Sequence, residues 1–391
     1  GVVVREFRVA IAAGVATVAL VVGCTSDEAP EASPSRPAQS ATPVDVRLAP
    51  SCPGVFNKRL RPTAEQINKS VAAGGLPAWQ AADIGASARL SDGRLVWLFG
   101  DTVRTAELSP RIVANSMLVT SGRCVSQLRT PDDGPVIPDV DSTTVRWPMS
   151  VAVGRQGSRD AIVVLCSRIR RGGGGSFDFT FLGTSAAVFT VQRGKAPTLQ
   201  KVLDLTSDST DPQQINWGAA ANVHDGWYYV YGTRLTGQKY VFGRELHVAR
   251  APIADPSKRK RWQFWDGSRW ASDPAKAAVI LPAEGGVSQT LSVDTVGGKF
   301  VAISKRDGDI ANFVYKWTAP NPWGPWTPTK EVKAPGGFDT GKLKYAPLAH
   351  PEIPLADGKL LVSVSRNTTH LERLLKDPEI GRPYFVEVPR G

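Results

Sequence analysis

A strand-like motif recurs five times along the chain and restricts the folds that the chain can adopt. The copies are GRLVWLFGDT from Gly93, RDAIVVLCSR from Arg159, DGWYYVYGTR from Asp225, GGKFVAISKR from Gly297 and DGKLLVSVSR from Asp357. Aligned copies are separated by 66, 66, 72 and 60 residues. A weaker predicted strand precedes each copy and a third strand follows it. Five such antiparallel units predict an all-β, five-bladed β-propeller. A β-sandwich is the alternative, but its strands recur every 8–12 residues without a longer period.

The repeat also predicts which residues share one face of the propeller, because the open ends of the first hairpin of every blade lie on the same side. The inner strands are expected to begin at Asp83, Ser150, Trp217, Gln289 and Ala349-His350. The second strands are expected to end at Asp101, Arg168, Arg234, Arg306 and Arg366-Asn367. Helical periodicity is confined to residues 63–73 and 371–376.

The first hairpin carries an acid at each of its open ends. Ser91-Asp92-Gly93 separates two apolar runs, and Asp-Gly between such runs is a strong hairpin signal. If Leu90 pairs with Arg94, antiparallel counting places Asp83 opposite Asp101. Side chains in such pairs have Cβ atoms about 4.5–5.5 Å apart. Two carboxylates at that distance repel each other unless a function requires both.

The N-terminal residues are typical of a targeting sequence rather than of a folded domain. Arg5 and Arg8 precede an apolar run that ends in Gly23-Cys24, as in a bacterial lipoprotein signal. We therefore expect residues 1–23 to be a signal peptide, residues 24–50 a disordered tether lipidated at Cys24, and residues 51–391 the propeller. An ordinary cleaved signal or a short membrane span is the alternative. The expected location is the outer face of the cell membrane.

The number of cysteines and the net charge limit the disulfides, partners and ligands that the chain can have. Beyond Cys24, the three cysteines allow one disulfide and one free thiol; Cys166 lies in an apolar strand, which leaves Cys52 and Cys124 as candidate partners. The net charge of +11 suits anionic polymers or lipid head groups of a cell envelope, and no nucleic-acid-binding motif is present. We expect a monomer without cofactor or zinc site. A structural calcium ion near His350 stays open, although no acidic loop motif supports it.

A propeller face with paired acids, arginine, asparagine and aromatic residues suits a carbohydrate. Glycoside hydrolysis generally requires two carboxyl groups, and Asp83 and Asp101 are our candidates. Asp101 could instead bind backbone amides of its own turn. The competing acids are Glu352, Asp294 and Asp178, and the expected substrate-binding residues are Trp217, Gln289, His350, Arg366 and Asn367. The chain contains no sialidase Asp-box, phosphate-binding loop or Gly-x-Ser-x-Gly elbow.

Four short motifs of the first blade resemble the mycobacterial endo-D-arabinanases, glycoside hydrolase family 183. They are Asp83-Ile84-Gly85, Asp92-Gly93-Arg94, Phe99-Gly100-Asp101-Thr102 and Asn115-Ser116. The resemblance extends from about Trp79 to the C-terminus, although Ala82 departs from the Thr common before the first Asp. It implies a five-bladed propeller that cleaves internal α-D-arabinofuranosyl linkages of arabinogalactan and lipoarabinomannan. It also implies that Asp83 and Asp101 are catalytic and that Asn115 lies at the substrate. A non-catalytic propeller that binds cell-wall glycan or an envelope protein, and hydrolysis of another furanoside such as L-arabinan, are the alternatives.

Overall fold

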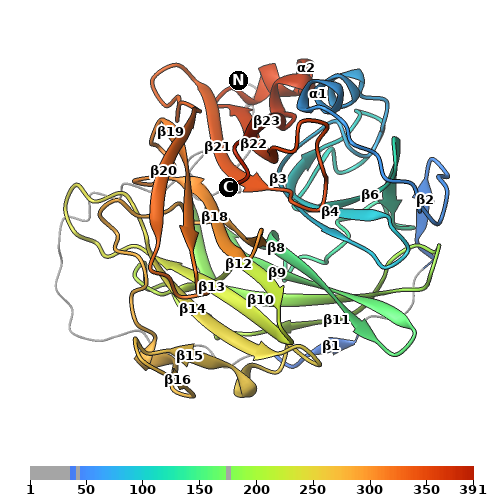
Figure 1. The fold of residues 1–391 in the computed structure, drawn as a ribbon. Coiled ribbons are helices and arrows are strands. Elements are labelled where there is room, and N and C mark those ends of the chain that lie inside the picture. The colour runs from blue at the N-terminus through green and yellow to red at the C-terminus, as the bar shows by residue number, and fades with distance from the viewer. Residues whose placement is uncertain (1–35, 41–44, 173–177) are drawn as a thin grey trace.

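The computed structural model describes residues 36–40, 45–172 and 178–391. Its strands form five antiparallel sheets, each built from consecutive strands, and the sheets follow one another around the molecule so that the first and last lie side by side (Figure 1). The innermost strands contact one another in a ring, β3 to β8, β8 to β12, β12 to β17, β17 to β21 and β21 to β3. The fold is therefore an all-β, five-bladed propeller, as the repeat predicts.

The blades have the following strands. Blade one comprises β3 (Ala81–Arg89), β4 (Leu95–Val103), β6 (Ser116–Ser121) and β7 (Cys124–Arg129), with β5 (Ile112–Val113) beside β4. Blade two comprises β8 (Thr144–Gln156), β9 (Arg159–Arg171), β10 (Phe179–Val191) and β11 (Thr198–Asp204). Blade three comprises β12 (Asn216–His224), β13 (Trp227–Arg234), β14 (Glu245–Pro252), β15 (Gln263–Trp265) and β16 (Trp270–Ala271). Blade four comprises β17 (Ser292–Val296), β18 (Lys299–Lys305), β19 (Phe313–Ala319) and β20 (Thr327–Lys333). Blade five comprises β21 (Lys342–Ala349), β22 (Leu360–Thr368) and β23 (Tyr384–Val388).

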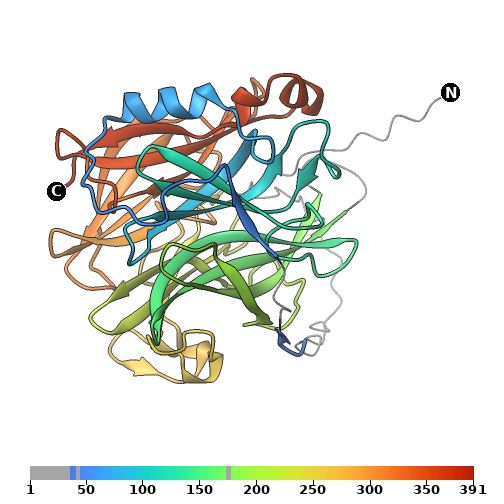
Figure 2. The same ribbon diagram turned by 90° about the vertical axis from the view of Figure 1, so that its right-hand side faces the viewer.

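Two α-helices occur where the sequence predicts them, α1 (Ala64–Ala73) and α2 (Leu371–Lys376). A capping box begins α1, because the Thr63 hydroxyl accepts from Gln66 N while the Gln66 side chain accepts from Thr63 N. The helix covers the outer edge of blade five (Figure 2), where the amide of Asn68 pairs with the backbone of Phe385 in both directions at 2.8 Å. In the described part of the chain, no helix has the length and apolar character needed to cross a membrane.

One predicted inner strand is wrong. The expectation for blade five was a strand beginning at Ala349-His350, but the inner strand is β21, which ends at Ala349. In β21 buried Leu343 and Tyr345 alternate with exposed Lys342 and Lys344, the usual pattern of a half-buried strand. His350 therefore lies at the opposite end of the blade from the predicted position.

The segment predicted as a tether is partly ordered. Strand β1 (Gln39–Ser40) pairs with β11, and β2 (Arg47–Ala49) pairs with β7, so both extend propeller sheets. The expectation of disorder over residues 24–50 is thus corrected for residues 36–40 and 45–50. The proposed signal peptide and Cys24 lie outside the described residues.

The cysteines behave as expected from their sequence context. Cys52 and Cys124 form a disulfide with a Cα–Cα distance of 5.7 Å, and Cys166 is a buried free thiol. The disulfide joins the segment that follows β2 to the outermost strand of blade one. It therefore fixes the entry of the chain into the propeller.

Candidate active site in the first blade

The β3–β4 hairpin has the predicted register and a bulge at the predicted acids. Ala82 pairs with Thr102 and Ala86 with Leu98, and both pairs have the residue-number sum of the predicted Asp83–Asp101 pair. Between them the register shifts twice around Ile84. Asp83 and Asp101 therefore lie inside a bulge rather than in a regular cross-strand pair.

The bulge places Ile84 in a strained conformation. Its φ is 71°, a value that β-branched residues rarely adopt, and the side chain is 1% exposed. Gly85 follows with φ 80°, and a Cβ there would approach the ring of Phe99 to 2.8 Å. The Ile84 amide donates to Ser365 Oγ of blade five at 2.9 Å. Packing between the first and last blades therefore holds a strained backbone directly beside Asp83, as is common at functional sites.

Asp83 is bound by a tyrosine of the last blade. Its side chain is 3% exposed, and Oδ2 accepts a hydrogen bond of 2.8 Å from the Tyr345 hydroxyl. Asn367, a predicted substrate-binding residue, lies within 3.4 Å of that hydroxyl through Nδ2. Burial, with the nearby carboxylates of Asp83 and Asp101, raises the pKa of Tyr345 well above its ordinary value. Tyr345 is therefore a hydrogen-bond donor close to both acids.

Asp101 is held by donors from blade two. Its Oδ1 accepts from Trp147 Nε1 at 3.0 Å and from Arg171 Nη2 at 2.8 Å, whereas its Oδ2 has no hydrogen-bond partner among the described residues. Burial raises the pKa of Asp101 to about 6, against the opposing effect of the Arg171 charge and the two hydrogen bonds. A carboxyl group with this pKa carries a proton in about half of the molecules at pH 6 and in about one in ten at pH 7.

Asp139 lies on the solvent side of this cluster. It is exposed, on the loop that precedes β8, and its charge raises the pKa of Asp101. Its own pKa is also raised, chiefly by partial loss of hydration, against the effect of Arg171 and Arg146. Arg171, with 35% of its side chain exposed, thus stands between a buried and an exposed carboxylate.

Two predicted substrate-binding residues serve packing instead. Asn115 is fully buried, donates to the carbonyls of Ile137 and Arg146 at 2.9 and 3.0 Å, and accepts from Ile137 N at 2.9 Å. It braces the loop between blades one and two. The ring of Trp217 is 4% exposed and packs edge-on against Phe264, so it provides no stacking surface and the expectation for it is corrected.

Three further predicted residues lie apart from the two aspartates. The backbone carbonyl of Gln289, a residue that is 6% exposed, accepts from Thr233 Oγ1 at 2.8 Å. Arg366 Nε donates to Arg382 O at 2.7 Å and supports the segment before β23. His350 is fully buried between Ser87 Oγ at 2.6 Å and Ser363 Oγ at 2.7 Å, and burial lowers its pKa to about 3. The imidazole is neutral and belongs to the far end of the channel.

Two of the three competing acids lie together, away from the bulge. Glu352 contacts Ser87, four residues along β3 from Asp83 and toward the turn. Burial raises the pKa of Glu352 to about 7, and burial together with Glu352 raises that of Asp294 well above its ordinary value. Asp178 lies closer to the site, because its backbone carbonyl accepts from the amide of Gly172, the residue after Arg171, at 2.8 Å. Residues 173–177, which precede it, lie outside the described residues.

The structure adds Tyr345, Arg171, Trp147 and Asp139 to the site. Tyr345 was missed because the inner strand of blade five was assigned too late in the sequence. Arg171 was missed because β9 continues three residues beyond its predicted end at Arg168. Within the described ranges, no group of three or more His, Cys, Asp or Glu side chains could hold a metal ion.

Several solved structures superpose on this chain. A candidate hydrolase from Bacteroides ovatus ATCC 8483 superposes with a TM-score of 0.63 at 17% identity, over 88% of this chain and 94% of the other. RS223-β-xylosidase gives a TM-score of 0.44 at 13% identity, over 80% and 93%. CoXyl43, a β-xylosidase/α-arabinofuranosidase from a compost microbial metagenome, gives 0.46 at 12%, over 80% and 92%. At 17% identity, the likeness to the Bacteroides ovatus protein concerns the fold alone.

The family comparison covers the whole propeller. No curated protein matches this chain. Residues 75–390, from the end of α1 to the last residues of blade five, match one family of unknown function. The chain therefore belongs to the family described as Domain of unknown function (DUF5005).

Proposed function

We propose that this protein is a glycoside hydrolase that cleaves internal α-D-arabinofuranosyl linkages of cell-wall arabinan, with Asp101 as general acid and Asp83 as nucleophile or base. The observation that carries the proposal is the contrast between the two carboxylates of one bulge. Asp83 accepts a hydrogen bond from a neutral tyrosine, whereas burial raises the pKa of Asp101 to about 6. Two carboxyl groups with different environments are the general requirement for glycoside hydrolysis.

The roles of Asp101 and Asp83 follow from which carboxyl group can hold a proton. A general acid must hold a proton at working pH and give it to the leaving glycosidic oxygen, which a carboxyl group with a raised pKa can do. Asp83 would then attack the anomeric carbon directly or remove a proton from an attacking water. The arabinan substrate rests on the resemblance of the first-blade motifs to the endo-D-arabinanases.

The approach to the two acids passes Arg171 and Asp139. Both aspartates are buried, while Arg171 is partly exposed and bonded to Asp101. A substrate oxygen that reaches Asp101 would displace or share the Arg171 contact. Anchorage at the outer face of the membrane through Cys24 would place this approach near cell-wall polymers, and we propose it as part of the same function.

The direct test is incubation of the protein with arabinogalactan and analysis of the released oligosaccharides. Asp83→Asn should abolish release and Asp101→Asn should slow it about 10²- to 10⁴-fold. Asp225→Asn, at a side chain that is 85% exposed, should leave release unchanged. Absence of release by the unaltered protein, or full activity in both site variants, contradicts the proposal.

The burial of both acids favours a second candidate, a non-catalytic propeller that binds cell-wall glycan. Asp83 and Asp101 are only 3% and 5% exposed. In that case the protein would retain arabinan in a pull-down and release no sugar after prolonged incubation. The same incubation thus separates the two functions.

A further inference from the structure

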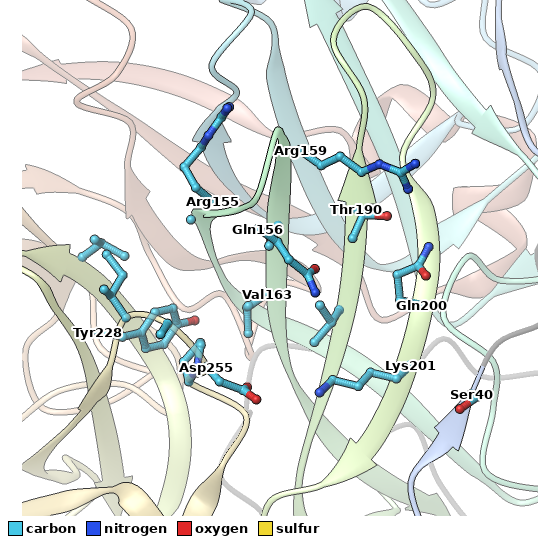
Figure 3. Close-up of a pocket in the computed structure, with 17 residues that line it drawn as sticks. Ser40, Arg155, Gln156, Arg159, Val163, Thr190, Gln200, Lys201, Tyr228 and Asp255 are labelled. Atoms are coloured by element: carbon cyan, nitrogen blue, oxygen red, sulfur yellow. The ribbon is translucent and has the colours of Figure 1, made fainter.

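A cavity of about 500 Å³ opens on the flank of the propeller between blades two and three (Figure 3). Its walls come from the β8–β9 turn, strands β10, β11 and β13, and the loop after β14. Arg159 of this cavity begins β9, whereas Arg171, the partner of Asp101, ends it. The residues that line the cavity include neither aspartate of the candidate active site, nor Trp147, Arg171 or Tyr345. The cavity is therefore distinct from the candidate active site.

A buried tyrosine hydroxyl in this wall lacks a hydrogen-bond partner. Tyr228 is 2% exposed, and no described residue bonds its hydroxyl. In Figure 3 the hydroxyl points into the space beside Val163 and Asp255. Burial raises the pKa of Tyr228 far above its ordinary value, so the group is neutral and can both donate and accept. Buried polar groups without partners are rare, and one at a cavity wall indicates a site for a polar ligand atom.

Other polar side chains face the same space. Lys201 reaches toward it from β11 and Asp255 from the loop after β14, on opposite sides of the opening (Figure 3). The side-chain amide of Gln156 points between them. Arg155 is directed elsewhere, since its guanidinium bonds Asp160 Oδ1 at 3.0 Å and Ser91 Oγ at 2.9 Å.

The mixture of groups discriminates between ligand classes. A compact anion between Lys201 and Asp255 would be attracted by the ammonium group and repelled by the carboxylate. A neutral polyhydroxylated ligand satisfies both, because each sugar hydroxyl donates and accepts. Val163 and Val188 add an apolar floor for the C–H face of a sugar ring. The volume also falls within the range of small-ligand sites, about 300–1,000 Å³.

We propose that this cavity is a second glycan-binding site that holds a short stretch of neutral oligosaccharide on the flank of the propeller, outside the candidate active site. The choice of an arabinan probe rests on the proposed function. Such a site would hold one part of a polymer while the bulge acts on another, and would raise the local concentration of linkages.

The test is calorimetric titration of full-length Asp101→Asn protein, which should cleave the probe about 10²- to 10⁴-fold more slowly than the unaltered protein, with an arabinan tetrasaccharide. Two sites per chain are expected. Adding Tyr228→Phe to the Asp101→Asn protein should weaken binding at one of the two sites by about 2- to 12-fold, the effect of one neutral hydrogen bond. Lys201→Met should weaken the same site. Tyr229→Phe is the matched control, because this neighbour on β13 interacts with Arg250 instead.

Each other outcome counts against the site. A single tetrasaccharide site in Asp101→Asn protein, or two unchanged affinities after Tyr228→Phe and Lys201→Met together, overturns the proposal. Binding of inorganic phosphate that depends on Lys201, with no second sugar site, assigns the cavity to anions and also overturns it. Failure of the unaltered protein to cleave arabinan overturns the proposed function alone, because the titration measures binding without cleavage.

Discussion

The hydrogen bond of 2.8 Å from the Tyr345 hydroxyl to Asp83 Oδ2 joins residues 262 positions apart, across the seam between the last and first blades. The same seam carries the bond from the Ile84 amide to Ser365 Oγ. Closure of the propeller and assembly of the candidate site are therefore the same structural event. A partly closed ring would leave Asp83 without its tyrosine and Ile84 without the packing that holds its strained backbone.

Tyr345→Phe should reduce turnover more than substrate binding, because it removes the donor to Asp83 and keeps the buried ring. We expect kcat to fall by roughly 10-fold or more, on the scale of a lost hydrogen bond to a charged group of about 1.5–3 kcal/mol. Steady-state kinetics on arabinan measure the change in kcat. Tyr384→Phe, on the exposed edge of the same blade, is the control. An equal effect of the two substitutions would contradict the role given to Tyr345.

Arg171→Met should move the alkaline limb of the pH–rate profile to higher pH. Asp101 must be protonated to act as acid, so activity falls as the pH rises through its pKa of about 6. Arg171 lowers that pKa, and its removal raises it. The profile of kcat should therefore extend toward alkaline pH. Arg170→Met, at the exposed neighbour on β9, should leave the alkaline limb of the profile unchanged. A shift of that limb to lower pH in Arg171→Met would contradict the assignment of Asp101 as the acid.

Asp101 should also make the stability of the protein pH-dependent in a defined direction. The pKa of Asp101 in the folded protein, about 6, exceeds the ordinary value of 3.8. Between pH 4 and pH 6 the folded state therefore binds more protons than the unfolded state. The contribution of Asp101 to stability falls as the pH rises through this range. The free energy of unfolding of the unaltered protein, relative to Asp101→Asn, should fall by at most about 3 kcal/mol between pH 4 and pH 7. Denaturant titrations at several pH values measure the difference. A difference that rises with pH would be the opposite of this expectation.

Removal of the disulfide should destabilise the protein without altering the bulge that carries Asp83 and Asp101. Cys52 and Cys124 are 72 residues apart, and Cys52→Ser with Cys124→Ser should lower the free energy of unfolding by about 2–4 kcal/mol. Cys166, which is buried, should react with thiol reagents only after unfolding. Specific activity per folded molecule should stay unchanged; its loss would place the disulfide closer to the site than the structure does.

The sequence was sufficient for the fold because each blade repeats one strong strand, such as AIVVLC before Ser167, at a nearly constant period. It also located Asp83 and Asp101 in one hairpin, since the Asp92-Gly93 turn fixes the register. Counting along the strands could not show the double shift at Ile84, because a bulge depends on how the inner strands pack around the axis rather than on local pattern.

The residues around the acids were harder to predict, because they come from other blades. Trp147, Arg171 and Tyr345 approach the hairpin only after the ring closes, and their sequence contexts resemble those of packing residues. Trp217 is the opposite case: it lies at the start of an inner strand, as predicted, but its ring is buried by packing and cannot contact a substrate. Long-range burial, rather than spacing, decides which side chains reach the site.

The central claim is that Asp101 gives a proton to the leaving oxygen while Asp83 acts at the anomeric carbon. The most direct measurement compares the hydrolysis of arabinan with that of a dinitrophenyl arabino-oligosaccharide, whose leaving group departs without protonation. Asp101→Asn should cut arabinan about 10²- to 10⁴-fold more slowly and the dinitrophenyl substrate at close to the unaltered rate, whereas Asp83→Asn should lose both. Equal losses on the two substrates in Asp101→Asn, or full activity in Asp83→Asn, would contradict the account.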